Sequence, residues 1–199
     1  MNLPNKISLT RICMIPVFVL IFFLDGVLPF NYGIAAILFA LAACTDFIDG
    51  HIARSRGLVT NLGKFLDPIA DKVLVATAMV LLLSRTSPLF WAFGFKGWSP
   101  VYITTAVCVC VILARELIIS AFRQIAAANG VVMAAEKLGK YKTACQDIAI
   151  FVLLLAADLG KAATVFAWIG FGLFAVATVL TVWSGITYVL KNKQVLKDA

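Results

Sequence analysis

The chain has 199 residues, of which 62% are hydrophobic and 14% are charged, and its mean hydropathy is +1.00. Soluble domains average about 45–50% apolar and about 25% charged residues. The composition therefore excludes a disordered chain and an ordinary soluble domain, and it predicts an integral membrane protein with a single domain over residues 1–199. Because 17 Lys and Arg stand against ten Asp and Glu, the net charge is +7, and the positions of these charges become the main source of information.

Six apolar runs are long enough, with their flanks, to form membrane-spanning helices of about 20 residues. In chain order they are Ile12–Leu24, Gly33–Cys44, Val73–Ser84, Val101–Ala114, Ile148–Ala157 and Ala162–Val189. The stretch Met1–Arg11 mixes apolar and polar residues, so it is expected to lie along the membrane interface before the first span. The predicted fold is an all-α integral membrane protein with six transmembrane helices and an N-terminal interfacial segment.

Basic residues are distributed unevenly between the two sides of these spans. All but three of the 17 fall near the chain termini or in the connections between spans 2 and 3 and between spans 4 and 5; the exceptions are Arg85, Lys96 and Lys161. Cytoplasmic loops carry an excess of Lys and Arg. Both termini and these two connections are therefore predicted to be cytoplasmic.

Four of the ten acidic residues fall close together, at the predicted cytoplasmic ends of spans 2 and 3: Asp46, Asp49, Asp67 and Asp71. A carboxylate in a span costs about 2.5–3.5 kcal/mol, so such a group needs compensation. Spacings of three and four residues place each pair on one helix face, and carboxylate oxygens suit Mg²⁺ or Mn²⁺. A site for two such ions is predicted. For Asp67 alone, an alternative is a helix cap with Pro68 in the first turn.

Small and basic residues accompany the aspartates. Gly50 and Gly63 would let a ligand approach the backbone. Arg54 follows Asp46 by eight residues, and a guanidinium can bind a phosphate through two parallel hydrogen bonds. This combination predicts a phosphate-containing substrate beside the metal site.

The segment from Asp46 to Asp71 reads DFIDGHIARSRGLVTNLGKFLDPIAD and fits the pattern DxxDGxxARx(8)GxxxDxxxD at every fixed position. This pattern resembles the signature of the CDP-alcohol phosphatidyltransferase family, and a match of this length is specific. Three further stretches, Leu3–Pro16, Ala114–Arg123 and Leu138–Thr143, resemble the bacterial phosphatidylglycerophosphate synthases within that family. The resemblance extends over essentially the whole chain.

The resemblance implies that a phosphatidyl group passes from CDP-diacylglycerol to the primary hydroxyl of sn-glycerol 3-phosphate, with release of CMP, as the committed step toward acidic phospholipids. It implies a multi-pass, homodimeric protein of the bacterial inner membrane whose active site faces the cytoplasm. By matching positions, Asp46, Asp49 and Asp67 would hold one metal ion, and Asp46, Asp67 and Asp71 the other. Asp71 would also be the general base. The residues implied for CDP-diacylglycerol are Asn5, Ser8, Gly50, Ala53, Arg54, Thr60 and Gly63.

The phosphate of the acceptor needs two or three cationic donors. Four candidates, Arg115, Arg123, Lys140 and Lys142, lie near the predicted cytoplasmic face. Two alternatives stay open at this point. Arg115 could form a purely structural ion pair with its neighbour Glu116, and the two lysines could be membrane anchors whose ammonium groups reach to water.

Two other functions compete with this interpretation. Inositol phosphate could replace glycerol 3-phosphate as the acceptor in the same chemistry. Carboxylates in the membrane also serve divalent-cation transporters, which need a pathway through the bilayer. Here the acids cluster toward one face while the outer halves of spans 2 and 3 are apolar, and this arrangement favours the enzyme.

Overall fold

The computed structural model describes residues 3–55, 61–84, 100–128 and 137–193. Within these ranges, the side chains of residues 3–4, 46–55, 61–62, 64–65, 67, 128 and 137 are not among those described. Every regular element in these ranges is helical: α1 Leu3–Phe22, α2 Asn31–Ser55, α3 Asn61–Leu82, α5 Pro100–Ala128, α6 Lys137–Ala156, the 3-10 turn η1 Ala157–Ala162, and α7 Ala163–Lys191. The all-α prediction is confirmed for this part of the chain.

The helices have the length and composition of membrane spans. The long helices contain 20 to 29 residues, so each is at least about 30 Å long, the thickness of a bilayer's hydrocarbon core. Among the described residues, three stretches are both long and apolar enough to cross a membrane: Asn5–Phe22, Pro100–Ala127, and Leu138–Lys191, which contains α6 and α7. The apolar part of α2, Asn31–Thr45, is shorter. The number of spans and their orientation stay predictions.

The first helix begins within the predicted interfacial segment. Helix α1 runs without interruption from Leu3 to Phe22, so the residues up to Arg11 continue directly into the first predicted span, and their place at the membrane interface stays a prediction. A stripe of buried polar residues, Asn5, Ser8 and Arg11, repeats every three residues and leads into the buried apolar face. Nε of Arg11 donates to the carbonyl oxygen of Ala42 at 3.0 Å and to Oγ1 of Thr45 at 3.2 Å. These bonds attach α1 to α2.

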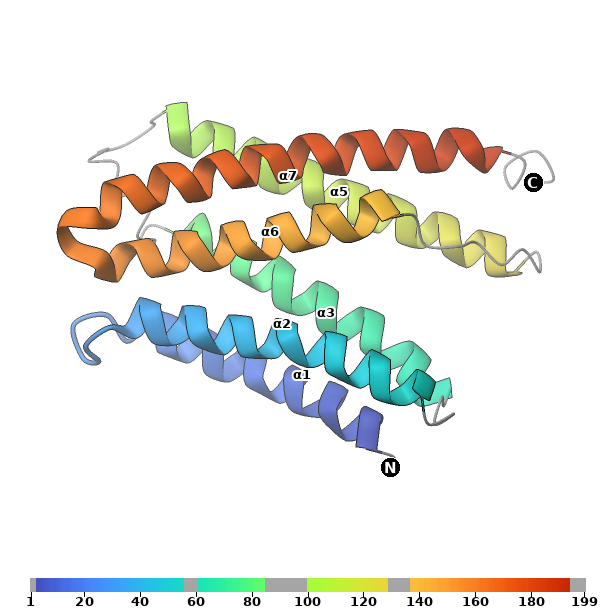
Figure 1. Ribbon diagram of the computed structural model, residues 1–199, viewed down its shortest axis with the longest axis horizontal. Helices are drawn as coiled ribbons and strands as arrows, with labels where there is room; N and C mark the ends of the chain where they lie inside the picture. Colours follow the sequence, from blue (N-terminus) through green and yellow to red (C-terminus); the bar gives the residue numbers. More distant parts are fainter. Residues whose placement is uncertain (1–2, 56–60, 85–99, 129–136, 194–199) are drawn as a thin grey trace.

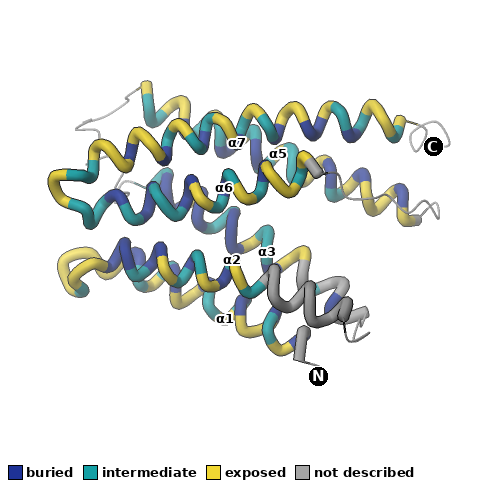
Figure 2. Tube along the Cα trace, viewed as in Figure 1, coloured by how far each residue is buried: buried dark blue, intermediate teal, exposed yellow. Residues whose placement is uncertain are grey.

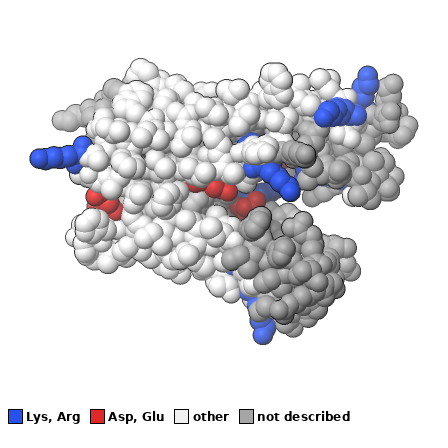
Figure 3. Space-filling view, in the orientation of Figure 1, with Lys and Arg blue, Asp and Glu red and all other residues white. Residues whose placement is uncertain are grey.

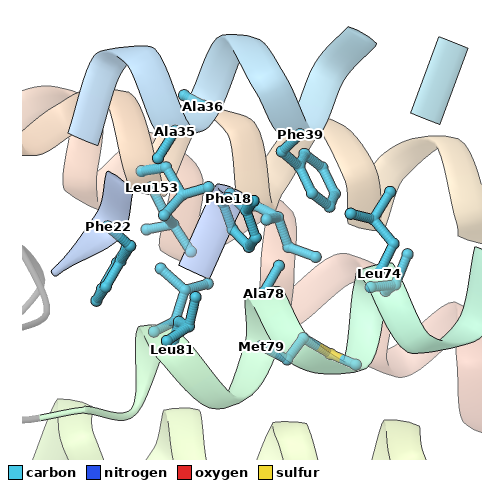
Figure 4. Close-up of a cluster of buried hydrophobic side chains, with 14 of the residues drawn as sticks. Phe18, Phe22, Ala35, Ala36, Phe39, Leu74, Ala78, Met79, Leu81 and Leu153 are labelled. Carbon is cyan, nitrogen blue, oxygen red and sulfur yellow. The ribbon is translucent and has the colours of Figure 1, made fainter. Parts of the chain in front are cut away.

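The helices form two groups. Helices α1, α2 and α3 pack on one another, and α5, α6 and α7 form the second group; α2 and α3 both contact α6 (Figure 1). Where the groups meet, the core contains Phe18, Phe39, Met79 and Leu153 (Figure 4). Alanines lie among these large side chains in this close-up and let the helices approach closely.

Helices α6 and α7 form a tight antiparallel hairpin. Gly160 in the turn has φ +51, a conformation that favours glycine. The eighth buried position of α7 is Gly185, and the other seven alternate between steps of three and four residues: Ala167, Gly170, Phe174, Ala177, Thr181, Ser184 and Tyr188. This spacing is typical of two helices packed side by side at a small angle. The prediction that the final apolar run forms one long helix is confirmed.

One end of the bundle collects the chain termini. Figure 1 places the N- and C-termini at the same end, together with the last turns of α2 and α5 and the first turns of α3 and α6. The opposite end holds η1, where Oδ2 of Asp158 accepts a hydrogen bond from the backbone N–H of Gly33 at 2.6 Å. This contact satisfies a free N–H group in the first turn of α2.

The outer faces of the helices are apolar. Exposed positions follow the outward side of the bundle in Figure 2, and on α7 they include Val165, Trp168, Val176, Val179 and Trp183. Lipid chains can cover such faces without the polar surroundings that a soluble domain needs. The fold is therefore that of a membrane-embedded helical bundle.

The contact between α6 and α7 yields a stability prediction. A Cβ atom at Gly170 would lie 2.7 Å from Cγ of Leu153, whereas one at Gly172 would meet nothing within 4 Å. Overpacking of this kind costs about 1–3 kcal/mol, while both substitutions gain the same helix propensity of about 1 kcal/mol. Gly170→Ala should therefore melt at least about 3 °C below Gly172→Ala in detergent. Equal melting temperatures would contradict the close packing of the hairpin.

Candidate functional site

Helices α2 and α3 carry the four predicted metal-binding aspartates. The last part of α2 includes Asp46 and Asp49, and the first half of α3 includes Asp67 and Asp71. Each pair therefore lies within one continuous helix, as the spacing argument requires. The side chains of Asp46, Asp49 and Asp67 lie outside the described residues, and their role as ligands stays a prediction.

The alternative reading of Asp67 as a helix cap is wrong. Helix α3 begins at Asn61, so Asp67 is already in its second turn and Pro68 lies inside the helix. A proline inside a helix lacks the N–H that would bond to the carbonyl four residues earlier. The missing hydrogen bond would have joined Pro68 to the carbonyl of Lys64, so it lies before Asp67 and not between the two aspartates.

Asp71 is the one predicted metal-binding aspartate whose side chain the structure describes. It is half-buried on α3 and interacts electrostatically with Lys142 of α6. In the next position, Nζ of Lys72 donates to Oγ of Ser120 on α5. The helix that carries the predicted base is thus connected directly to the second helix group.

The predicted metal ligands are described only in part. In the described part of the chain, no group of three His, Cys, Asp or Glu could hold a metal ion, and three of the four predicted ligands fall outside that part. The one that is described, Asp71, offers hard carboxylate oxygens from a half-buried helix position, which is the donor type that Mg²⁺ and Mn²⁺ prefer. The two-ion site stays a prediction.

Three residues predicted for CDP-diacylglycerol are described, and all three are buried. Asn5 and Ser8 lie on the first turns of α1, and Gly63 lies on the first turn of α3. Since α1 packs on α2 and α3, these residues lie at the same end of the bundle as the aspartates. Four further residues were predicted for this site, and they lie outside the residues whose side chains the structure describes: Gly50, Ala53, Arg54 and Thr60.

The predicted acceptor site contains a cluster of charges that links three helices. Oε1 of Glu116 on α5 accepts a hydrogen bond from Nη1 of Arg115 at 3.0 Å and another from Nζ of Lys142 on α6. Nη2 of Arg115 donates to Oγ of Ser184 on α7 at 3.0 Å. We call Arg115, Glu116 and Lys142 the Glu116 cluster.

The cluster decides one of the two alternatives for the cationic residues. Lys142 is 4% exposed, so it is not an anchor whose ammonium group reaches to water, and that alternative is wrong for this residue. Lys140 is exposed and an anchoring role remains compatible with its position. The ion pair between Arg115 and Glu116 is present, and it is shared with a second cation.

Arg123 lies two turns further along α5. Its Nε donates to the hydroxyl oxygen of Tyr188 on α7 at 3.1 Å, and the guanidinium carbon lies 5.2 Å from the centroid of the Tyr188 ring. Both contacts hold the guanidinium in a defined direction. Because Arg123 is exposed, an anion from solution can reach it.

Sequence reasoning missed several residues that hold the cluster. Ser120 accepts from Lys72 and donates to the carbonyl oxygen of Glu116 at 2.6 Å, and Ser184 accepts from Arg115. A signal existed for Ser184, because it and Gly185 are adjacent small residues in a membrane span, and such residues are enriched where helices contact each other. Gln146 was also missed: it is 3% exposed, and its Oε1 has no partner among the described groups.

The two helix groups separate toward the end of the bundle that holds the termini. In the space-filling view, acidic and basic side chains gather between the two helix groups (Figure 3). Contacts between α3 and α6, and the bond from Lys72 to Ser120, join the two groups there. A carboxylate on one group and paired cations on the other can bind a phosphate ester and accept a proton from a neighbouring hydroxyl.

Comparison with known proteins agrees with this chemistry. The sequence model described as CDP-alcohol phosphatidyltransferase matches residues 1–183. Curated relatives named CDP-diacylglycerol–glycerol-3-phosphate 3-phosphatidyltransferase occur in Bacillus subtilis (39% identity over 100% of this chain and 98% of the relative), Shigella flexneri (37%, 99% and 98%) and Rickettsia typhi (35%, 94% and 94%). None of these matches favours the transporter.

The Glu116 cluster yields a second stability prediction. Glu116→Gln leaves two cations close together, and a buried charge without its partner costs about 3–5 kcal/mol. The melting temperature should therefore fall, and adding Lys142→Met should recover part of the loss because it removes one of the two cations. Lys140→Met, at an exposed position two residues away, should change the melting temperature little. A double variant less stable than Glu116→Gln would contradict the described pairing.

Proposed function

Because the chain belongs to the CDP-alcohol phosphatidyltransferase family, we propose that it transfers the phosphatidyl group of CDP-diacylglycerol to sn-glycerol 3-phosphate and releases CMP. The observation that carries the choice of acceptor is the cluster of Arg115 and Lys142 on helices that face Asp71. A phosphate on the acceptor needs such cations, whereas serine, choline or ethanolamine does not. The names of the relatives support the same acceptor.

The proposed reaction is a substitution at phosphorus. The primary hydroxyl oxygen of glycerol 3-phosphate forms a bond to the phosphatidyl phosphorus, and the bond from that phosphorus to the oxygen bridging to CMP breaks. CMP leaves with the bridging oxygen. Asp71 takes the proton of the attacking hydroxyl, since a carboxylate within hydrogen-bond reach is a suitable base. Lys142 and Arg115 hold the acceptor phosphate, and Arg123 approaches it from the exposed side.

The donor and metal sites complete the proposal. Asp46, Asp49, Asp67 and Asp71 would hold two Mg²⁺ or Mn²⁺ ions, and such ions, when bound, stabilise negative charge on the diphosphate. The proposed donor residues are those of the family pattern and of the first helix: Asn5, Ser8, Gly50, Ala53, Arg54, Thr60 and Gly63. Buried Asn5, Ser8 and Gly63 would give the cytidine diphosphate a polar, closely fitting wall.

The proposed orientation is six spans, with both termini and the active site at the cytoplasmic face of the bacterial inner membrane. This orientation is supported by the shared end of the termini and by the basic residues Lys6, Arg123, Lys140 and Lys191 carried on helix turns at that end (Figure 1). It also brings the acyl chains of the donor into lipid while the soluble acceptor and CMP reach water. We propose a homodimer on the strength of the family resemblance.

A direct assay tests the reaction and its base. Purified protein with CDP-diacylglycerol and Mg²⁺ should release CMP with glycerol 3-phosphate, should lose activity with a chelator, and should release little with inositol phosphate. Asp71→Asn should lower turnover by at least about 10²-fold, the smallest usual contribution of a general base, while donor binding persists. Asp158→Asn retains an oxygen for Gly33 and serves as the matched control. Near wild-type CMP release from Asp71→Asn would rule out the base.

The acceptor site is tested by Arg123→Ala. Loss of a charged hydrogen bond of about 1.5–3 kcal/mol should raise KM for glycerol 3-phosphate by about tenfold or more. KM for CDP-diacylglycerol should stay within about twofold, because the donor is assigned to α1, α2 and α3. Lys6→Ala removes an exposed cation of α1 at the same end and is the control. If Arg123→Ala leaves the acceptor KM unchanged, the phosphate binds elsewhere.

A further inference from the structure

Glu116 has no place in the proposed metal, donor or acceptor sites, yet it contacts two of the three cations proposed for the acceptor phosphate through a single oxygen. We infer that Glu116 is a positioning residue that holds Lys142 and Arg115 together as a clamp for the acceptor phosphate. The inference rests on the proposed function, and it adds a role for the carboxylate of Glu116, whose negative charge lets the two cations lie close together.

Charge explains why the clamp needs a carboxylate. Lys142 comes from α6 and Arg115 from α5, and both donate to Oε1 of Glu116. Two cations this close repel each other strongly in surroundings of low dielectric constant. With Glu116 between them the three groups carry a net charge of +1. The clamp therefore still attracts an anion, while Glu116 offsets the repulsion that would otherwise push Lys142 and Arg115 apart.

The clamp retains donors for a phosphate. An ammonium group has three N–H donors and a guanidinium has five. Glu116 takes one donor from each cation, and Ser184 takes another from Arg115. A phosphate oxygen that enters the cluster can therefore bind both cations while Glu116 stays in place.

The same turn of α5 is fixed to the neighbouring helices. Ser120 donates to the carbonyl oxygen of Glu116 and accepts from Lys72, which directly follows the proposed base on α3. On the other side, a Cβ atom at Gly185 of α7 would lie 3.1 Å from Cγ of Arg115, so α7 forms a close wall against the arginine. The position of the clamp relative to Asp71 is thereby set through α5.

Two other roles for Glu116 predict a different effect of its removal on the KM for the acceptor. A carboxylate that only occupies the phosphate site would compete with the acceptor, so its removal would lower the acceptor KM. A purely structural ion pair would affect the melting temperature alone. A positioning residue should instead raise the acceptor KM, because its loss lets the two cations move apart.

The experiment measures CMP release by the purified full-length protein, with each substrate varied in turn and with inorganic phosphate as a competitive inhibitor. Glu116→Gln should raise the acceptor KM and the inhibition constant of phosphate together by about tenfold, as is usual when a group that orients ligand-binding residues is lost. The donor KM should stay within about twofold. Glu116→Asp keeps the charge with a shorter reach, so it should show a smaller rise. Asp158→Asn, at the opposite end of the bundle, should change neither constant.

A second background separates positioning from a direct contact with substrate. In Lys142→Met the repulsion between the two cations is gone, so adding Glu116→Gln should change the acceptor KM little further. An unchanged or lowered acceptor KM in Glu116→Gln, or an equal rise in the donor KM, would overturn the inference. If Glu116→Gln does not fold, Glu116→Asp carries the same test. Absence of CMP release by the wild-type protein would instead overturn the proposed function itself.

Discussion

The pairing of two cations, Arg115 and Lys142, with the single carboxylate of Glu116 is the interaction on which the proposed acceptor site depends. Lys142 is nearly fully buried and Arg115 is largely buried, so each cation needs an anion nearby. Glu116 supplies that anion to both through one oxygen. Because Glu116 belongs to α5 and Lys142 to α6, this ion pair links two helices that each pack on α7 and contact α3.

The rest of the structure supports this cluster at a distance. Gly170 and the small residues of the buried face of α7 allow α6 and α7 to pack tightly, and the apolar core around Phe18 and Met79 attaches α6 to the first three helices. Core packing thus holds the backbone of α6 in place from both sides, and this fixes the position from which Lys142 contacts Glu116. Helix α6 is therefore held both by apolar packing and by the ion pair.

Much of this arrangement could be predicted from the sequence. Runs of apolar residues gave the helices, and the fixed spacing of Asp67 and Asp71 placed both on α3, because helix periodicity is a local property. The partner of Lys142 could not be predicted, because Glu116 lies 26 positions away and is brought close only by the way α5 and α6 both pack on α7. For the same reason the sequence could not distinguish an exposed lysine such as Lys140 from a buried, ion-paired one such as Lys142.

Pro68 shows a different limit of sequence reasoning. An aspartate followed by a proline is typical of a helix start, yet α3 begins at Asn61 and continues through both residues. Packing of α3 on α1 and α2 outweighs the local preference, as tertiary contacts often do. The N–H that Pro68 lacks would have bonded to the carbonyl of Lys64, so the missing hydrogen bond lies before Asp67 and the helix continues from Asp67 through Asp71. The shared helix face of these two aspartates therefore follows from helix periodicity alone. The start of the helix, in contrast, depends on tertiary packing and could not be predicted from the Asp-Pro pair.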